Sequence, residues 1–413
     1  MDDQLRTLID LVRIPSVDGT DAEVAIVETV AGLLRVEGIE VDCWPIPVAD
    51  LAGRADFPGM EVPRSAALGL VARLPGSGGG RSLMVNGHLD VVPPGDLDAW
   101  TDDPFSGRLL DGHVYGRGAC DMKGGVVSAL HALLALRGSA LSGHPLRGDV
   151  LFAAVVGEED GGLGTYAMLD RGWRADACVI TEPTNLDLLV ANGGALTFRL
   201  RVPGRASHAS TRTAGVSAVE KFQPVFAALR AFEATRNATV DPVMARWDVA
   251  YPLEIGTVRA GDWSSSVPDL LVAEGRFGVA LDEPVAVARA AFEAAVADAC
   301  RADPWLRDHP VTVEWWGGQF ASGRCSSDEL VAALVRADGR SPSVASLGDK
   351  SAISVGGAPY GSDLRLLAAA GVPTLQYGPG EARYAHAPDE RVPVAQVHHC
   401  TETLVRLARD WCA

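Results

Sequence analysis

Apolar residues in the first 190 positions recur at two spacings, one typical of helices and one typical of strands. After Asp21, which suits a helix N-cap, apolar side chains repeat at helical intervals from Val24 to Leu34. Short apolar runs bounded by glycine and proline predict buried strands that alternate with the helical stretches, and this alternation predicts a layered α/β fold. The expected helices cover residues 4–13, 21–38, 125–136 and 164–171, and the expected strands cover residues 67–74, 82–85, 150–156 and 177–180.

The pattern changes after residue 192 and returns near residue 327. Between these points the order is β-α-β-β-α-β, which forms an α+β unit of its own. Its elements are expected at residues 195–202, 217–234, 253–258, 270–279, 284–300 and 311–316, and the first pattern resumes with a helix at 327–337 and a strand at 374–377. The simplest architecture is a split α/β/α domain, residues 1–192 and 321–413, with an α+β domain inserted at 193–320.

Length and charge narrow the class of protein. A chain of 413 residues suggests about two domains, and 47% hydrophobic with 22% charged residues is ordinary for a globular protein. The formal net charge of −17 argues against nucleic acid and anionic membrane surfaces as partners, because both would repel it. Solubility is the simplest account of this charge.

Cysteine usage and the start of the chain favour a cytoplasmic protein. The seven cysteines are scattered without C-x-x-C pairs, which favours reduced thiols. Cys120 has no base beside it in sequence, so we interpret it as a packing residue rather than a nucleophile. The acidic, polar start is no signal peptide, and no run reaches the roughly 18 apolar residues of a membrane span. We therefore expect no membrane partner.

The first of five chemically suggestive patches follows the predicted strand that ends at Val85. His88 and Asp90 lie two positions apart and so point to the same side of an extended chain. His88 can bind a metal through one ring nitrogen while Asp90 orients the ring through the other. A lone histidine after a strand is usually structural, but the paired aspartate and the other patches favour a ligand.

The second patch surrounds Asp121 with glycines at positions 118, 124 and 125. Glycine lets the backbone bend tightly and approach a site closely. A carboxylate here can bridge two metals through its two oxygens; the alternative is a helix cap, since a helix is expected directly afterwards. Lys123 is expected to be a surface or capping charge rather than a catalytic group.

The remaining patches hold acids and a second histidine. Glu158 and Glu159 follow an apolar strand, and two adjacent carboxylates repel each other unless a positive group lies between them. Because adjacent side chains diverge, one can bind metal while the other acts as general base; the alternative is a solvated acidic turn. Glu182 follows another strand, and His386 lies in a glycine- and proline-rich stretch. Taken alone, Glu182 is a weak signal and His386 is better read as structural.

Together the patches supply two histidines and several carboxylates, which suits two divalent metal ions that share a bridging carboxylate. Two ions about 3.5–4 Å apart can clamp a hydroxide and a carbonyl oxygen in one site. Zinc is the expected metal for this donor set, and cobalt or manganese also fits it. Hydrolysis of an amide is therefore the leading hypothesis.

Ordered short motifs occur along nearly the whole chain. They are Ile14-Pro15-Ser16, Gly87-His88-Leu89-Asp90-Val91-Val92-Pro93, Gly116-Arg117-Gly118, Asp121-Met122-Lys123-Gly124-Gly125, Glu158-Glu159, Glu182-Pro183-Thr184, Gly204-Arg205-Ala206-Ser207-His208, Tyr377-Gly378-Pro379-Gly380 and His386-Ala387-Pro388-Asp389-Glu390. This set resembles the di-zinc aminoacylase and carboxypeptidase family of metallopeptidases. Within that family it looks most like acetylornithine deacetylase and succinyl-diaminopimelate desuccinylase.

The resemblance implies a role for each residue of the patches. The implied metal ligands are His88 and Glu182 for one ion, Glu159 and His386 for the other, and Asp121 as the bridge. Asp90 would orient His88, and Glu158 would be the general base.

The resemblance also implies that residues 193–320 are a lid and dimerisation domain, and hence that the protein is a homodimer. His208 matches the lid histidine that reaches into the partner subunit's site and stabilises the developing oxyanion. Without the family, His208 would be read as a polar residue on a loop.

Departures from the family pattern concern the substrate rather than the metals. Ser265, in Ser265-Ser266-Val267-Pro268, replaces the amide side chain expected to touch substrate. Arg276 only loosely matches an arginine of the family, because it is displaced from the usual spacing. Arg365 is a second candidate for binding a substrate carboxylate, which arginine grips with two hydrogen bonds. A surface salt bridge accounts for Arg365 equally well.

The sequence thus predicts a cytoplasmic, metal-dependent amidohydrolase that removes an N-acyl group, of the acetyl type, from an amino acid or similar small amine. The alternatives are a dipeptidase or carboxypeptidase, an N-succinyl desuccinylase, and a deformylase of a heterocyclic amine. A metal-stabilised binding protein on the same fold is the non-enzyme alternative. Glu158 and His208 speak against it, because a structural metal site needs neither a base nor an oxyanion donor.

Overall fold

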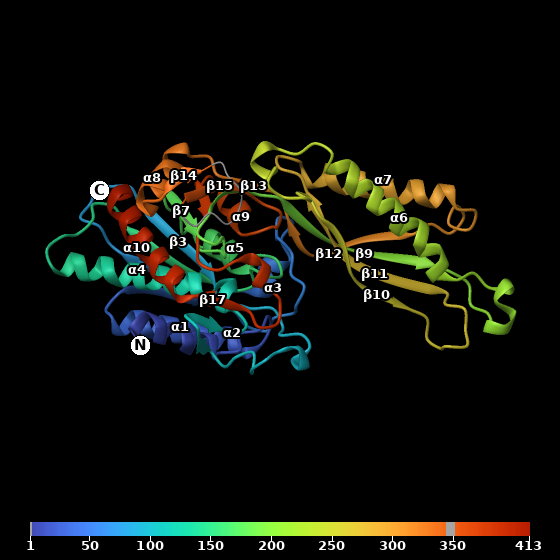
Figure 1. Cartoon of the computed structure of the whole chain (residues 1–413), viewed down its shortest axis with the longest axis horizontal. Helices are drawn as coiled ribbons and strands as arrows, with labels where there is room; N and C mark the ends of the chain where they lie inside the picture. Colours follow the sequence, from blue (N-terminus) through green and yellow to red (C-terminus); the bar gives the residue numbers. More distant parts are fainter. Residues whose placement is uncertain (1, 344–351) are drawn as a thin grey trace. The chain divides into compact units, whose positions relative to one another are not determined.

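The computed structural model describes residues 2–343 and 352–413, which divide into two units with separate hydrophobic cores. Unit 1 comprises Met1–Ala191, Arg324–Gly357 and Ser362–Ala413, and unit 2 comprises Asn192–Gly323 and Ala358–Gly361. The predicted fold class, a split α/β domain with an inserted α+β domain, is confirmed (Figure 1). Unit 2 also includes a short later segment, 358–361, that the sequence pattern did not reveal.

Besides a small antiparallel sheet of β4 Arg108–Leu110, β5 His113–Tyr115 and β17 Arg391–Pro393, unit 1 is built on one large mixed sheet. Its described strands are β1 Glu40–Pro45, β2 Leu68–Leu74, β3 Leu83–His88, β6 Val150–Val155, β7 Ala177–Ile180, β8 Leu188–Asn192, β13 Gly323–Arg324, β14 Ser341–Ser343, β15 Ala352–Ala358 and β16 Thr374–Gln376. They run in the order β1-β2-β6-β3-β7-β16-β8-β15-β14, with β13 paired to β8. Strands β6, β3, β7 and β16 are parallel, whereas β1 and β2 are antiparallel additions at one side. Every residue of β6 and β7 is apolar and buried, as expected for strands covered on both faces.

Helices cover both faces of this sheet. The helices of unit 1 are α1 Asp3–Val12, α2 Asp21–Val36, α3 Val48–Ala52, α4 Gly124–Leu141, α5 Leu163–Asp170, α8 Asp328–Asp338, α9 Leu364–Ala369 and α10 Val394–Trp411. α4 packs on β3 and β6 and runs beside α10, while α2 and α5 pack on β2 (Figure 1). Right-handed crossovers from β3 through α4 to β6, and from β6 through α5 to β7, place α4 and α5 on opposite faces.

The structure of α4 differs from expectation in two ways. The helical stretch Ala119–Leu141 is long and apolar enough to cross a membrane, yet its apolar positions belong to the core of unit 1. Lys123, the N-cap residue of α4, was expected to be a surface or capping charge. It is fully buried and donates from Nζ to the carbonyl oxygens of Leu11 (3.1 Å) and Ile14 (2.8 Å). Burial lowers the pKa of Lys123 to about 7. The surface-charge prediction is wrong because carbonyl groups at the end of α1 supply acceptors inside the fold.

The C-terminal helix α10 is not among the predicted elements. Its apolar positions nevertheless recur at helical spacing, and Val397, Cys400, Leu404 and Leu407 are all buried. α10 packs on α4 and α8 and so closes one face of unit 1.

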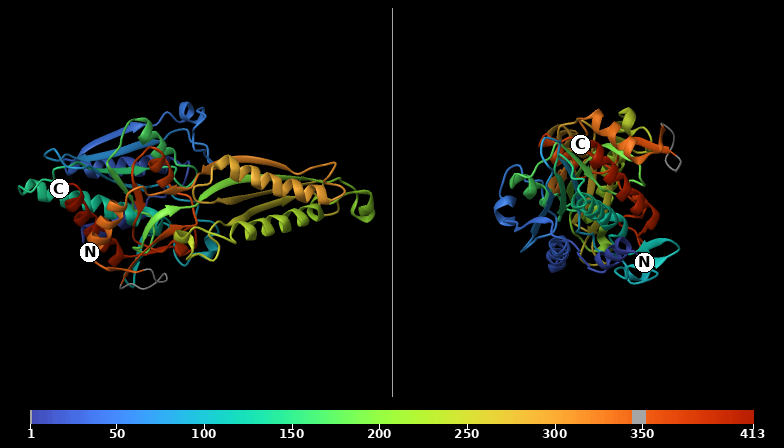
Figure 2. Two further views of the ribbon diagram at one scale, coloured as in Figure 1. Left: turned by 90° about the horizontal axis from the view of Figure 1, so that it is seen from above. Right: turned by 90° about the vertical axis from the view of Figure 1, so that its left-hand side faces the viewer.

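Unit 2 is an antiparallel sheet with two helices on one face (Figure 2). Its main elements are β9 Gly194–Pro203, α6 Ala218–Arg236, β10 Leu253–Ala260, β11 Leu270–Val279, α7 Val285–Ala302 and β12 Thr312–Phe320. The strand order is β10-β11-β9-β12, and the chain order confirms the predicted β-α-β-β-α-β unit. Phe198, Phe277 and Phe292 meet in its core, where the ring of Phe292 lies 4.6 Å from that of Phe198 and 5.1 Å from that of Phe277.

Candidate metal centre and active site

Three neighbouring parallel strands, β6, β3 and β7, end at the same edge of the sheet of unit 1. His88 is the last residue of β3, Glu158 follows β6, and Glu182 follows β7. Ligands of open α/β sheets bind at the carboxyl ends of the strands, so this edge is the expected site. Asp121, from the turn before α4, and His386, from a loop after β16, join the same group of side chains.

His88, Asp121 and Glu182 form a first ligand group, in which the ligand atoms lie within 4.8 Å of one another. His88 Nε2 is 3.1 Å from Asp121 Oδ1, and His88 Nδ1 is 3.0 Å from the backbone oxygen of Asp90. The nearest carboxylate oxygen of Asp90 is 3.7 Å from Nδ1. Asp90 therefore orients the ring through its backbone carbonyl, which differs from the carboxylate contact expected from the sequence.

Asp121, Glu159 and His386 form a second ligand group with the same spacing limit of 4.8 Å. His386 Nε2 lies 3.0 Å from Glu159 Oε2 and 3.6 Å from Asp121 Oδ2. The two oxygens of Asp121 thus face different histidines, Oδ1 toward His88 and Oδ2 toward His386. The N-cap of α4 is Lys123 rather than Asp121, so the helix-cap alternative for Asp121 is wrong.

Both histidines are held among negative charges. Burial by itself lowers the pKa of His88, but the charges of Asp90, Asp121 and Glu182 outweigh it and raise that pKa well above its usual value. The charge of Glu159 raises the pKa of His386 to about 9. The surrounding carboxylates therefore stabilise a positive charge on each ring. A bound cation at the same place satisfies these carboxylates equally.

Glu158 and Glu182 are buried carboxylates. Burial, and then the negative charges around them, raise the pKa of each well above its usual value. Glu158 Oε1 and Asp90 Oδ1 are buried, and within residues 2–343 and 352–413 neither atom has a hydrogen-bond partner. Buried polar atoms are normally paired, so these two oxygens indicate that a further polar group belongs at this edge. The solvated-turn alternative for Glu158 is wrong because the side chain is buried.

The donor chemistry of the two groups fits a pair of divalent ions. Each group offers one imidazole nitrogen and carboxylate oxygens, which are the ligands of zinc and of related first-row metals. A carboxylate shared between the groups matches the sharing expected when two ions are close together. The residues present therefore fit a dinuclear centre.

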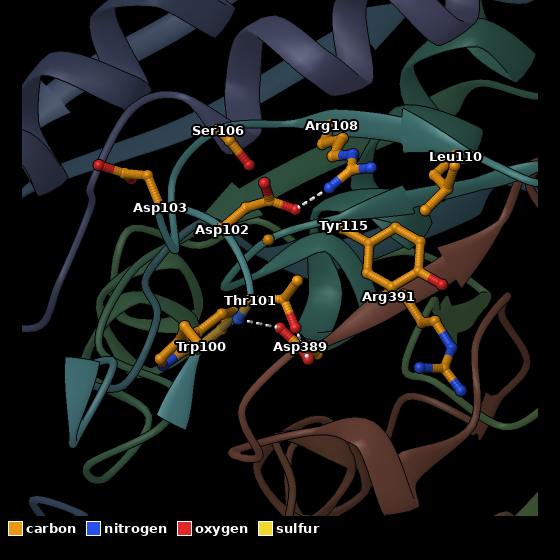
Figure 3. A pocket seen from close by; sticks show the side chains of 11 residues that line it. Trp100, Thr101, Asp102, Asp103, Ser106, Arg108, Leu110, Tyr115, Asp389 and Arg391 are labelled. Carbon is orange, nitrogen blue, oxygen red and sulfur yellow. Dashed lines mark hydrogen bonds and ion pairs between the residues drawn. The ribbon is translucent and has the colours of Figure 1, made fainter. Parts of the chain in front are cut away.

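The loop that carries His386 is held by hydrogen bonds just after this residue. His386 itself adopts a left-handed backbone conformation, with φ of 59°. Three residues later, Asp389 accepts hydrogen bonds from the Thr101 N–H (2.9 Å) and hydroxyl (2.7 Å). Both residues line a pocket of about 220 Å³ together with Trp100, Asp102, Arg108, Tyr115 and Arg391 (Figure 3). This pocket is lined by none of the candidate ligand residues, so it is not the candidate metal site.

Glu390 holds the turn that carries Asp121. Its Oε1 accepts hydrogen bonds from the backbone N–H groups of Cys120 (2.9 Å) and Asp121 (3.0 Å), and its Oε2 pairs with Arg117 Nη1 at 2.5 Å. Cys120 is fully buried, and burial raises the pKa of its thiol well above the usual value, which agrees with a packing role. The position of the Asp121 carboxylate thus depends on a buried ion pair.

Comparison with known proteins identifies the family. The sequence profile of peptidase family M20/M25/M40 matches residues 84–410, which is most of the chain. The chain belongs to this family. A succinyl-diaminopimelate desuccinylase from Paracoccus denitrificans is 30% identical to this M20-family chain over 385 residues, covering 89% of this chain and 92% of that protein. An N-formyl-4-amino-5-aminomethyl-2-methylpyrimidine deformylase from Halalkalibacterium halodurans is 28% identical over 355 residues, covering 80% and 79%.

Solved structures of the M20 family share the fold. A di-peptidase from Saccharomyces cerevisiae has a TM-score of 0.74 at 15% identity, covering 99% of this chain and 95% of its own. A dinuclear metal binding peptidase from Bacillus subtilis has a TM-score of 0.58 at 16% identity, covering 99% and 98%. Family membership confirms that the chain is a hydrolase of amide bonds, and it removes the binding-protein alternative.

Two predicted residues of unit 2 lie side by side in this M20-family chain. The N–H of Ala209 donates to the backbone oxygen of Ser265 at 2.9 Å, and His208 forms a β-bridge with Ser266. His208 is exposed, and its Nδ1 accepts a hydrogen bond from the Ser210 N–H at 3.1 Å. Because Nδ1 is an acceptor there, the neutral ring carries its proton on Nε2.

The two candidate arginines lie elsewhere. Arg276 is on β11 with its guanidinium 5.4 Å from the centre of the Phe320 ring. Leu270 marks the end of β11 that lies near His208. Arg276 is six residues further along the strand, or about 20 Å at a rise of about 3.4 Å per residue, so it is far from His208. Arg365 is buried and donates to the backbone oxygens of Ser362 (2.8 Å) and Gly161 (2.6 Å). The surface-salt-bridge account of Arg365 is wrong, and these backbone bonds favour a structural role over contact with substrate.

Sequence reasoning missed Asp363 as a member of the site. Asp363 is buried, and its negative charge is among the causes that raise the pKa of Glu158 and of Glu182. The signal at this position is that of a helix N-cap, because Asp363 directly precedes α9. A cap and a site carboxylate look alike in sequence, so only the fold separates them.

Proposed function

We propose that this hydrolase removes an N-acyl group from a small amine, such as an N-acylated amino acid, with two divalent metal ions and Glu158 as general base. The observation that carries the proposal is the arrangement around Asp121. Its two oxygens face two separate ligand groups, and a buried carboxylate that binds in neither group, Glu158, lies at the same edge of the sheet. The dinuclear peptidase from Bacillus subtilis supports the presence of two ions.

Each residue has a distinct task in this proposal. His88 with Glu182, and Glu159 with His386, would hold the two ions, with Asp121 between them. When bound, two such ions lower the pKa of a water molecule and polarise the amide carbonyl. Glu158 accepts the proton of that water at Oε1 and later donates it to the leaving nitrogen. The raised pKa of Glu158 suits it to hold this proton between the two steps.

The substitution Glu158→Gln tests the role of the base. It should preserve the fold and the metal content, while turnover falls by on the order of 10²–10⁴, the usual contribution of general acid–base catalysis. Glu402→Gln on the exposed side of α10 is a matched control and should turn over like wild type. Wild-type turnover by the Glu158 variant would mean that another group is the base.

Metal analysis tests the ions independently of turnover. Protein prepared without chelator should carry about two divalent ions per chain. Activity should disappear with a chelator and return with zinc, cobalt or manganese, and the relative rates would identify the preferred metal. Full amidase activity with no bound metal would refute the proposal.

The identity of the acyl group is the next question about the substrate. An N-acetyl amino acid such as N-acetylornithine is the first candidate, and the named relatives support N-succinyl and N-formyl amines as the next two. A panel of N-acetyl, N-succinyl, N-formyl and dipeptide substrates, compared by kcat/KM, separates these classes. A dipeptide preferred over every acyl amine would replace deacylation with peptidase activity.

We also propose that the protein works as a homodimer in which His208 serves the partner subunit's active site. The exposed His208 ring, with its proton on Nε2, is suited to donate a hydrogen bond to an oxyanion. Mixing inactive Glu158→Gln chains with inactive His208→Ala chains should restore activity, because one site of each mixed dimer regains both groups. No recovery after demonstrated subunit exchange would show that His208 does not act in trans.

A further inference from the structure

Arg64 lies outside the motifs that carry the proposed chemistry, on the segment that leads into β2. Its side chain is 0% exposed and is surrounded by three buried carboxylates. Nη2 lies 2.6 Å from Asp18 Oδ1, Nε lies 3.0 Å from Glu23 Oε2, and Nη1 lies 2.7 Å from Asp160 Oδ2. A guanidinium with this many charged partners fixes the relative positions of the segments that supply them.

One of these segments is the turn that holds the two catalytic-site glutamates. Asp160 directly follows Glu158 and Glu159, and its Oδ2 also accepts hydrogen bonds from the N–H groups of Glu61 (3.1 Å) and Val62 (2.9 Å). Asp160 is therefore tied to the segment 61–64 through three donors. The turn cannot shift at this end without breaking buried, charge-assisted bonds.

Arg64 also contacts the other end of the same turn. Gly157 has a φ of +71°, and a Cβ added to it would lie 3.3 Å from Arg64 Cζ, so the guanidinium packs closely against the Gly157 backbone. A Cβ added to Gly161 would lie 2.0 Å from the backbone oxygen of Gly59, so the same segment covers the turn on this side too. Arg64 and its neighbours thus touch the turn before Glu158 and after Glu159.

We propose that Arg64 is a positioning residue that clamps the 157–160 turn, so that Glu159 reaches its ligand group while Glu158 is held away from it as the base. This proposal rests on the function proposed above. Among the described residues, Arg64 is hydrogen-bonded to none of the proposed metal ligands; it acts through Gly157 and Asp160. The Glu159 N–H, bonded to Asp90 Oδ2 at 3.1 Å, links the clamped turn to the strand end that carries His88.

The test is Arg64→Lys in the full-length, metal-loaded protein. Lysine keeps the charge, but its single ammonium cannot serve three separated carboxylates and lie flat on Gly157. A misplaced base should lower kcat by on the order of 10²-fold with KM little changed. The ion at Glu159 and His386 should bind about 10–100-fold more weakly, as when other residues that orient metal ligands are changed. Metal content, measured at controlled free Zn²⁺, should then fall toward one ion per chain.

Arg73→Lys is the matched control at the opposite end of β6. Arg73 Nε pairs with Asp149 Oδ2 at 2.8 Å, and Asp149 precedes the strand that the clamped turn follows. This variant should keep the wild-type kcat and two ions per chain. Asp160→Asn is the milder test of the clamp itself, because it leaves Arg64 paired with Asp18 and Glu23. It should reproduce the loss of kcat and of one ion, and adding Arg64→Lys should cost little more.

The proposal would be overturned if Arg64→Lys and Asp160→Asn both kept wild-type kcat and two ions per folded chain. Arg64 would then be a purely structural residue, whatever the change in melting temperature. Metal content separates this result from a failure of the proposed function. If Glu158→Gln kept wild-type turnover, Glu158 would not be the base, and selective loss of one ion would still report the clamp on Glu159.

Discussion

Replacing Glu390 with glutamine would remove a buried negative charge beside the turn that carries Asp121. In the structure the side chains of Glu390 and Arg117 are 0% and 2% exposed, and they form an ion pair at 2.5 Å. Glu390 Oε1 accepts the N–H groups of Cys120 and Asp121. Glutamine has the same shape, so the change tests the charge with little disturbance of packing.

The size of the stability loss depends on the Arg117 charge, which the substitution leaves buried without its partner. Removing one partner of a buried ion pair costs about 3–5 kcal/mol, because the other charge stays buried without compensation. The amide oxygen of glutamine can still accept from Cys120 and Asp121. Arg117 also keeps a contact with the Trp100 ring at 5.2 Å, and such contacts contribute about 0.5–2 kcal/mol. We therefore expect a loss at the lower end, about 3 kcal/mol.

Burial raises the pKa of Glu390 to about 7, so the loss is measured above that pH, where the carboxylate is charged. Urea denaturation of the metal-free protein should then show a lower midpoint with an unchanged slope. Calorimetric titration with Zn²⁺ should in addition show weaker binding, since the turn of Asp121, the proposed bridging ligand, is held less firmly. Glu402→Gln is the control and should change stability by less than about 0.5 kcal/mol. A loss for Glu390→Gln below about 1 kcal/mol, with unchanged metal affinity, would refute the idea that this ion pair holds the bridging ligand.

Three further predictions concern other parts of unit 1. The charge of Glu159 raises the pKa of His386 to about 9, so the metal-free ring is protonated at pH 7. Metal loading at pH 7 should therefore release protons into a weakly buffered solution. Release from this ring should vanish above about pH 9. Burial raises the pKa of Asp338, but hydrogen bonds from histidine, arginine and tyrosine side chains lower it below its usual value. The stability that this carboxylate supplies is complete above its unfolded pKa of about 3.9 and is lost as the pH falls through its folded pKa, so denaturation of Asp338→Asn should approach wild type only below about pH 4. Within α4, Gly138→Ala should raise the free energy of unfolding by about 0.5–1 kcal/mol, because the added Cβ meets nothing within 4 Å. Gly125→Ala should instead disrupt the fold, because its Cβ would lie 1.9 Å from a backbone oxygen. Equal denaturation midpoints for the two variants would contradict this packing.

The sequence predicted the main elements of unit 2 but only part of those of unit 1, namely α1, α2, α4, α5, α8, β2, β3, β6, β7 and β16. Burial of one face imposes a local period on the chain, so β6 and β7 appear as apolar runs and unit 2 as a separate β-α-β-β-α-β series. Several residues of the candidate site could be predicted for a related reason. His88, Glu158 and Glu182 each follow a predicted buried strand, and carboxyl ends of parallel strands meet at one edge.

Other residues gave a misleading signal because the sequence does not reveal their partners. Lys123 looks like a surface charge, yet two carbonyl groups near the end of α1 satisfy it inside the core. Arg365 looks like a surface salt bridge or a substrate contact, but it is buried, where it bonds the backbone of Gly161 and lies 3.8 Å from Asp363. Asp363 reads as a helix cap and also contributes charge to the site.

The sequence by itself therefore determined the fold class and which side chains could bind metal, since both depend on local pattern and residue type. Only the tertiary structure decided how those side chains are held. Arg64 shows why: Asp18 and Glu23, around the start of α2, and Asp160, after β6, reach it from two distant stretches of the chain. Whether a buried charge is stable depends on partners that long-range folding brings together, and no local period in the sequence encodes them.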